Sequence, residues 1–147
     1  MDAKMNGSEN EMSDFNTSII EEFRANEGRV GGDFEGSPLI LIHHIGAKSG
    51  AERVTPLGCF PQSDGRLVIV ASNGGAVKHP NWYHNLKANP EIRVEFGTEI
   101  FCAEVKELEG SDRRKVWTDA VDAVPILREY QRNTLRSIPV LVLTQVY

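Results

Sequence analysis

A short basic stretch between two hydrophobic runs carries the residue types best suited to holding an anion. Residues 46–57, GAKSGAERVTPL, follow the apolar run 38–45 and lead into a strand-like segment. Glycines let the backbone approach a ligand closely and expose successive N–H groups to it. Lys48 adds a point charge, and Arg53 can hold a phosphate or carboxylate with two parallel hydrogen bonds. Taken alone, the stretch is either an anion-binding loop or a solvated hairpin turn.

Other catalytic and metal-binding chemistries find little support. His43 and His44 are adjacent on an expected strand, so their side chains point to opposite faces of a sheet. His79 and His84 are five residues apart, which is not the i, i+4 spacing of two helical metal ligands. The sequence contains neither a G-x-S-x-G nor a G-x-G-x-x-G motif. We therefore expect no metal site and no acyl-transfer or dinucleotide-binding centre.

Length and composition indicate one globular domain. The chain has 147 residues, 40% of them hydrophobic and 25% charged, with a net charge of −5. A chain of this length can bury a sizeable core. The negative charge argues against general binding of nucleic acid, and no run approaches the roughly 20 apolar residues of a membrane span. We expect a disordered tail over residues 1–13 and a single domain over residues 14–147.

The cysteines and the N-terminus bear on the cellular location of the protein. Cys59 and Cys102 lie far apart in strand-like segments, so we expect both to be small buried hydrophobes in a reducing environment. The N-terminus is polar and acidic, unlike a secretory signal. A cytoplasmic location is the first expectation, and peripheral association with a membrane is the alternative.

The hydrophobic pattern predicts the elements that position the basic stretch. A helix capped by Ser13 or Asp14 runs to about Ala25 with one apolar stripe, and Phe34 anchors the glycine-rich linker that follows. Further helices are expected over 80–88, with Pro80 in its first position, over 113–123, capped by residues 110–112, and after Pro125. Hydrophobic runs bounded by turn signals, with clear alternation over 91–96, predict six strands, over residues 38–45, 52–61, 66–72, 91–96, 100–108 and 138–146. Hairpin connections favour an antiparallel barrel or rolled sheet with flanking helices, in the α+β class.

Three blocks in this order and spacing resemble a known enzyme family. They are GAKSGAERVTPLG (46–58), VASNGGAVKHPNWYHNLKANP (70–90) and YQRNTLRSIPVLVLT (130–144). Together they resemble the deazaflavin-dependent nitroreductases, which belong to the flavin/deazaflavin oxidoreductases with a split β-barrel fold. The upstream segment EEFRANEGRVGGDFEGSPLILI is similar too, so the likeness covers the chain from about residue 19 to its end.

The resemblance implies a cofactor and its contacts. The cofactor is the 8-hydroxy-5-deazaflavin coenzyme F420, a hydride carrier with a phosphate and a polyglutamate tail. The basic loop then faces the tail, the following strand lines the deazaflavin ring, and the second block contacts the polar edge of the ring and closes the groove. In chain order the implied cofactor-binding residues are Lys48, Ser49, Arg53, Pro56, Leu57, Ala71, Ser72, Asn73, Gly74, Trp82 and Asn85.

The resemblance also implies a reaction. Hydride passes from C5 of the reduced deazaflavin to an electron-poor small molecule, such as a quinone, a nitro compound or a conjugated enone or lactone. Such a reaction depends on the cofactor more than on protein acid–base groups. Ser72 is expected to donate a hydrogen bond to the acceptor oxygen, and Tyr130 to do the same or to pass a proton. Both are therefore implied catalytic residues.

Some positions depart from the family pattern. Ala47 replaces a common arginine, which removes one phosphate contact, and Asn73 replaces a lysine found in some relatives. The segment AVPILREYQ keeps only Tyr130 of a tyrosine cluster, so we expect a more apolar substrate pocket that is less suited to nitro prodrugs. Two other functions remain open: an FMN-dependent reductase on the same fold, or a non-catalytic carrier of deazaflavin, haem or a lipid-like ligand. A monomer and a homodimer are both compatible with the sequence.

Overall fold

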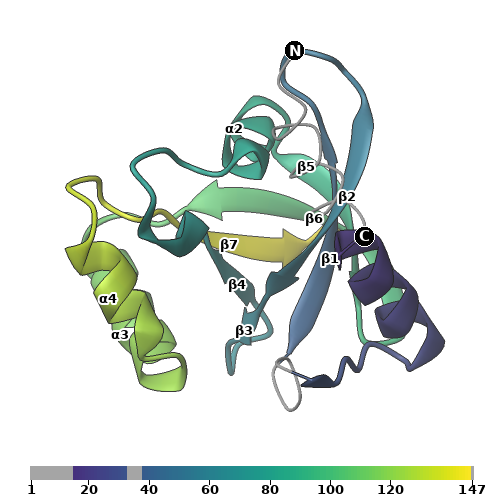
Figure 1. The fold of residues 1–147 in the computed structure, drawn as a ribbon, viewed down its shortest axis with the longest axis horizontal. Helices are drawn as coiled ribbons and strands as arrows, with labels where there is room; N and C mark the ends of the chain where they lie inside the picture. The colour runs from purple at the N-terminus through teal and green to yellow at the C-terminus, as the bar shows by residue number, and fades with distance from the viewer. Residues whose placement is uncertain (1–14, 33–37, 147) are drawn as a thin grey trace.

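The computed structural model describes residues 15–32 and 38–146 as one curled sheet with helices on its outer faces and at one end (Figure 1). The expected disordered tail, the caps at residues 13 and 14, and the anchoring role of Phe34 lie outside the described residues. Every strand pairing in the described part is antiparallel. The predicted α+β split barrel is therefore confirmed.

A single extended segment forms both edges of the seven-stranded sheet. The strand order is β2-β1-β5-β6-β7-β4-β3, with β2 (Glu52–Gly58) and β3 (Phe60–Pro61) at the two ends. Only Cys59 separates these strands, and its N–H donates to the carbonyl of Pro38 at 3.0 Å. The chain thus pairs first with β1 and then with β4, which curls the sheet into a barrel.

The inner strands follow one another around the barrel. Antiparallel pairing lets short turns join neighbours, as the two-residue turn between β5 and β6 does. The pairing of β1 with β5 and of β6 with β7 joins the two hairpins to the rest of the sheet. The remaining strand bounds are β1 Leu39–Ile45, β4 Leu67–Val70, β5 Glu91–Phe96, β6 Glu99–Glu107 and β7 Val140–Gln145.

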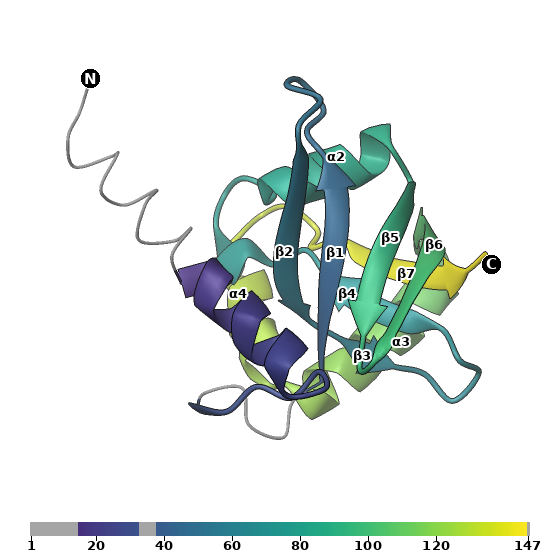
Figure 2. The same ribbon diagram turned by 90° about the vertical axis from the view of Figure 1, so that its right-hand side faces the viewer.

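Alternate residues of the strands fill the barrel interior. Ile40, Ile42 and Val94 are fully buried there, together with Ile69, and Leu86 of α2 (Asn81–Ala88) packs on them from one end. The burial of such side chains is worth about 1.5–3 kcal/mol each. Because α2 lies against the open end of the barrel, it sits beside both the β1–β2 hairpin and the loop after β4 (Figure 2).

Helices cover two of the outer faces. The helix over residues 15–25 places Ile19 and Phe23 on Leu39 and Leu41 of β1, so β1 is buried on both sides. On the far side, Val116 of α3 (Gly110–Ala123) packs against β4 and β7. The short α4 (Ile126–Arg132) completes that layer and touches the turn η2 (Asn73–Gly75).

The expected elements all form, with four local corrections. The expected strand 52–61 breaks at Cys59, which gives seven strands instead of six. Pro80 precedes α2 as its N-cap, and α3 already begins at Gly110, where a positive φ of 60° suits glycine. Cys59 is buried as expected, but Cys102 is exposed because the outer face of β6 has no covering helix in the described chain.

Candidate functional site

The tip of the β1–β2 hairpin is a turn closed by its own hydrogen bonds. The N–H of Gly46 donates to the carbonyl of Ala51, and the N–H of Gly50 donates to the carbonyl of Gly46, each at 2.9 Å. The hydroxyl of Ser49 accepts from the N–H of Ala51 at 3.2 Å. Lys48 stands exposed on this turn. The basic stretch is therefore a hairpin turn with a fixed backbone, which is also what an anion-binding loop requires.

A buried amide ties this turn to α2. Asn85 is 7% exposed, and its Oδ1 accepts from the N–H of Ala47 at 2.9 Å. Its Nδ2 donates to Nδ1 of His44 at 2.9 Å, and Nε2 of His44 lies 2.8 Å from Oγ1 of Thr55. The chain of bonds links β1, β2 and α2 at the hairpin end of the barrel.

The same network fixes the protonation state of His44. Since Nδ1 accepts from Asn85, the proton of the neutral ring is on Nε2, where it donates to Thr55. Burial, followed by the nearby charges of Arg53 and His43, lowers the pKa of His44 from 6.5 to about 4. His44 is therefore a neutral structural link at neutral pH. His43 points to the opposite face, as expected from the strand, and bonds Glu95 at 2.7 Å.

Strand β2 presents its predicted residues to two different sides. Arg53 pairs across from His44, so its side chain is on the same face as the Asn85 network. Leu57 shares that face and packs on the barrel core, whereas Pro56 points to the opposite side. Among the described residues, neither Lys48 nor Arg53 has a carboxylate within ion-pair distance. The hairpin end thus holds two cations without acidic partners.

The predicted loop after β4 forms a tight turn beside α4. Ala71 is fully buried, Ser72 is half-buried, and Asn73 and Gly74 are exposed. Asn73 and Gly74 both have positive φ, and the amide of Asn73 donates to the carbonyl of Lys78 at 3.0 Å. The loop is thus stabilised by a hydrogen bond between two of its own residues.

The same loop lies directly against the backbone of α4. A Cβ on Gly75 would lie 2.7 Å from the carbonyl oxygen of Tyr130, so only glycine fits this close approach. The phenol ring of Tyr130 packs with Val121 and Leu127 between α3 and α4. Tyr130 therefore borders the loop through its backbone, while its ring belongs to the helical layer.

Arg136, in the segment between α4 and β7, holds the loop from the other side. Its guanidinium donates to the carbonyls of Ala71, Ser72 and Ala76 at 3.3, 2.7 and 2.9 Å. It also lies 3.0 Å from Nδ1 of His79. The sequence reading did not single out Arg136, because no local pattern shows that residue 136 returns to residues 71–79.

Helix α2 joins the two parts of the candidate site. Trp82 packs on the barrel core, and Asn85, three residues later, bonds the hairpin turn. At the start of the helix the ring of His79 lies 4.5 Å from that of Tyr83, whose hydroxyl donates to Glu107 at 2.6 Å. The structure thus brings the hairpin turn, β2, the loop after β4 and α2 to one end of the barrel.

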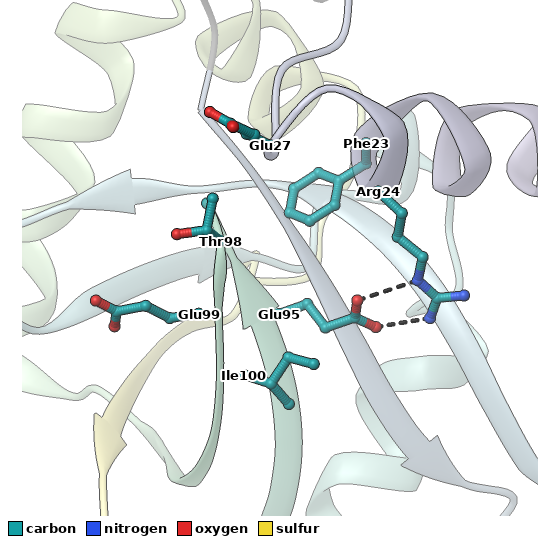
Figure 3. A pocket seen from close by; sticks show the side chains of 8 residues that line it. Phe23, Arg24, Glu27, Glu95, Thr98, Glu99 and Ile100 are labelled. Atoms are coloured by element: carbon teal, nitrogen blue, oxygen red, sulfur yellow. Dashed lines mark hydrogen bonds and ion pairs between the residues drawn. The ribbon is translucent and has the colours of Figure 1, made fainter.

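A pocket of about 220 Å³ lies elsewhere, between the N-terminal helix and the β5–β6 turn (Figure 3). Arg24 closes one side of it with two hydrogen bonds to Glu95, at 3.0 and 2.7 Å. None of the residues implied by the sequence lines this pocket. Its Arg24–Glu95–His43 chain fastens the N-terminal helix to the sheet.

Comparison with known proteins identifies the relatives. The family model for F420H(2)-dependent quinone reductase matches residues 17–145. An F420H(2)-dependent quinone reductase of Mycobacterium tuberculosis is 38% identical over 128 residues, which are 84% of this chain and 85% of that protein. A putative F420H(2)-dependent quinone reductase of the same species is 31% identical over 106 residues, 72% of this chain and 88% of its own.

Solved structures give the same picture. An F420-H2 dependent reductase called FDR-A superposes with a TM-score of 0.66 at 42% identity, covering 73% of this chain and 94% of its own. A second structure, described as a domain-swapped dimer, has a TM-score of 0.68 at 38% identity and covers 92% of this chain and 98% of its own.

We predict that Asn85→Ala destabilises the hairpin end of the barrel. The substitution leaves the N–H of Ala47 and Nδ1 of His44 without partners, and each loss costs about 1–3 kcal/mol. We expect the free energy of unfolding in urea to fall by about 2–4 kcal/mol. Asn81→Ala, at the exposed start of the same helix, is the control and should change it by less than about 1 kcal/mol. Equal effects of the two variants would contradict the network.

We also predict that His44 makes stability depend on pH. Its folded pKa of about 4 lies below its unfolded value of 6.5, so the unfolded chain binds the proton more tightly. Stability is complete above pH 6.5 and declines as the pH falls toward 4, by about 2–3 kcal/mol allowing for partial hydration. Urea unfolding at several pH values measures this decline. His44→Gln should flatten it relative to His84→Gln, a change at an exposed site on α2.

Proposed function

This chain belongs to the F420H(2)-dependent quinone reductase family, and we propose that it reduces a quinone-type acceptor with the reduced deazaflavin coenzyme F420. The match of the family model to residues 17–145 carries the proposal, because it spans nearly all of the described chain. The relationship to FDR-A, at 42% identity, supports the same cofactor.

The charges at the hairpin end fit the tail of this coenzyme. The tail carries a phosphate and a chain of glutamates, so it needs cations that are not already paired. Lys48 and Arg53 have no acidic partner among residues 15–32 and 38–146, in a chain whose net charge is −5. In our proposal these two side chains and Ser49 hold the tail. Ala47 makes no polar contact with the tail, because its side chain is a methyl group and its N–H already donates to Asn85.

The loop after β4 and α2 form the other end of the proposed groove. In our proposal Ser72 and the positive-φ turn at Asn73 and Gly74 hold the ring edge. The buried Ala71 supports them from behind, since its N–H and carbonyl are bonded to Pro139 and Arg136. The coenzyme, when bound, supplies the hydride. The protein keeps the ring still and the acceptor within about 3–3.5 Å, which accounts for much of the rate enhancement in such reactions.

In our proposal the acceptor meets Ser72 of the loop and the apolar helical layer beside it. The half-buried Ser72 is proposed to donate a hydrogen bond to the acceptor oxygen, where negative charge develops. Val124 and Leu127 beside Tyr130 make this layer apolar. An apolar layer suits a quinone better than a polar nitro compound, because it favours burial of the hydrocarbon part.

The structure of the described residues contains no helix that is long and apolar enough to cross a membrane. We propose a cytoplasmic enzyme that meets small-molecule acceptors, with peripheral contact to a membrane as the alternative. A homodimer is the proposed assembly, since one solved relative is described as a domain-swapped dimer.

Cofactor titration separates the proposed function from its two alternatives. The purified protein is titrated with coenzyme F420 and with FMN, followed by fluorescence, and then offered menadione with the reduced coenzyme. We expect tighter binding of F420 and oxidation of the reduced form by menadione. Tighter binding of FMN would make the FMN-dependent reductase the better assignment. Binding of F420 without turnover by any quinone or enone would instead indicate a carrier.

Arg53→Ala is predicted to weaken the binding of F420. Loss of a charged hydrogen bond costs about 1.5–3 kcal/mol, which is roughly a 10- to 150-fold increase in Kd. Arg66→Ala serves as the matched control, because Arg66 pairs with Asp64 in the β3–β4 turn. An unchanged Kd for Arg53→Ala would remove this residue from the proposed site.

Tyr130→Phe tests the implied proton donor. If its hydroxyl serves the acceptor, turnover with menadione falls by about 10-fold or more, while the Kd for F420 is unchanged. The ring packing with Val121 and Leu127 is retained in phenylalanine, so stability should change little. Unchanged turnover would leave Ser72 as the proposed donor.

A further inference from the structure

We propose that Arg136 is a positioning residue for the proposed reaction, and that it fixes the loop 71–76 in the shape that the ring end of the site requires. The inference rests on the proposed function, because the loop matters for turnover only if it borders the coenzyme. Arg136 itself would touch neither coenzyme nor acceptor. It acts through the backbone of the loop and through His79.

The contacts of Arg136 account for four of its N–H donors. Nη2 donates to Ser72, Nε donates to Ala76, and Nη1 serves both Ala71 and Nδ1 of His79. The acceptors at Ala71 and Ser72 precede the turn η2, and those at Ala76 and His79 follow it, so one planar group holds both arms of the loop together. We call this set of contacts the clamp. A guanidinium can do this because its donors form a rigid fork, whereas a lysine ammonium is a point charge on a flexible stem.

The segment that carries Arg136 is itself tied in place. The side chain of Gln131 donates to the carbonyl of Arg136 at 2.8 Å and accepts from the N–H of Ile138 at 3.0 Å. Gln131 of α4 thus holds the backbone on the C-terminal side of Arg136. The backbone next to Arg136 is therefore held by the helix whose own backbone lies against Gly75. The loop and its clamp therefore form one unit.

The clamp is complete only while His79 is neutral. Nδ1 of His79 accepts from the guanidinium, so a proton there would remove the acceptor and place two cations face to face. The groups that face His79 are Arg136, the rings of Tyr83 and His84, and Glu107. Burial, and then the charges of Arg136 and His84, lower its pKa below 6.5, against the opposing effect of Glu107. The bond is therefore present at neutral pH and lost on acidification.

The first test uses the protein without coenzyme. Hydrogen exchange is measured for the loop amides of wild type, Arg136→Lys and the control Arg132→Lys, which changes an exposed arginine paired with Glu129. We expect exchange of the hydrogen-bonded amides of Gly75 and Ala76 to rise at least about tenfold in Arg136→Lys and to remain as in wild type in the control. Unchanged exchange in Arg136→Lys would overturn the clamp.

The second test separates positioning from binding. At saturating reduced F420, Arg136→Lys should lower kcat with menadione by about tenfold or more, because a shift of about 1 Å in the site can cost a hundredfold. The Kd for F420 should stay within about threefold, since the proposed tail contacts are unchanged. Faster loop exchange with an unchanged kcat would overturn the positioning role. If wild type does not bind F420 at all, the proposed function fails, while the exchange experiment still decides the clamp.

The third test covers the case in which Arg136→Lys does not fold. His79→Asn keeps an acceptor near the place of Nδ1 but cannot titrate. In the wild type, loop exchange corrected for its intrinsic pH dependence should increase as the pH falls from 7.5 to 5. In His79→Asn it should stay flat over that range. The same pH response in both proteins would overturn the part of the proposal that involves His79.

Discussion

The whole molecule depends on one extended segment that pairs at both edges of the sheet. Residues 52–61 bond β1 along β2 and then bond β4 along β3, with Cys59 as the only residue between them. The sheet must curl for one chain segment to reach both partners. Curling creates an interior lined by alternate residues of the strands, and it leaves an open end that α2 covers (Figures 1 and 2). The candidate site lies at that end because the hairpin turn, the loop after β4 and α2 meet there.

Two polar anchors convert these neighbouring segments into one rigid site. Asn85 of α2 bonds the hairpin turn, and Arg136 bonds the loop after β4 from the side of α4. Both bind backbone N–H or C=O groups of a loop at the end of the barrel. Such groups need hydrogen-bond partners once they are removed from water. The anchors share a dependence on neutral histidines, since His44 and His79 each accept a hydrogen bond on Nδ1. Acid should therefore loosen both halves of the site together.

Charged side chains that have an ion-pair partner differ in place from those that have none among the described residues. Several arginines are paired with carboxylates, as Arg24 is with Glu95 and Arg66 with Asp64. Lys48 and Arg53 lack such partners among the described residues and stand at the hairpin end. A surface ion pair adds little stability, so leaving two cations unpaired costs the fold almost nothing. In our proposal they bind the anionic tail of the coenzyme.

Periodicity in the sequence determined the elements, because the alternation of apolar residues depends only on local geometry. Within the described residues it located the α-helices and the strands to within a few residues, apart from the division of segment 52–61, and three motifs together indicated the family and its cofactor. It also separated His43 from His44 correctly. Tertiary structure decided the rest: that Cys59 divides one strand into two, that Pro56 and Leu57 face opposite sides, and that Asn85 and Arg136 bind distant backbone. Asn85 reaches residue 47, and Arg136 reaches residues 71–79. No local pattern encodes such pairings, since they exist only after the sheet has curled and brought its hairpin turn, loop and helices to one end.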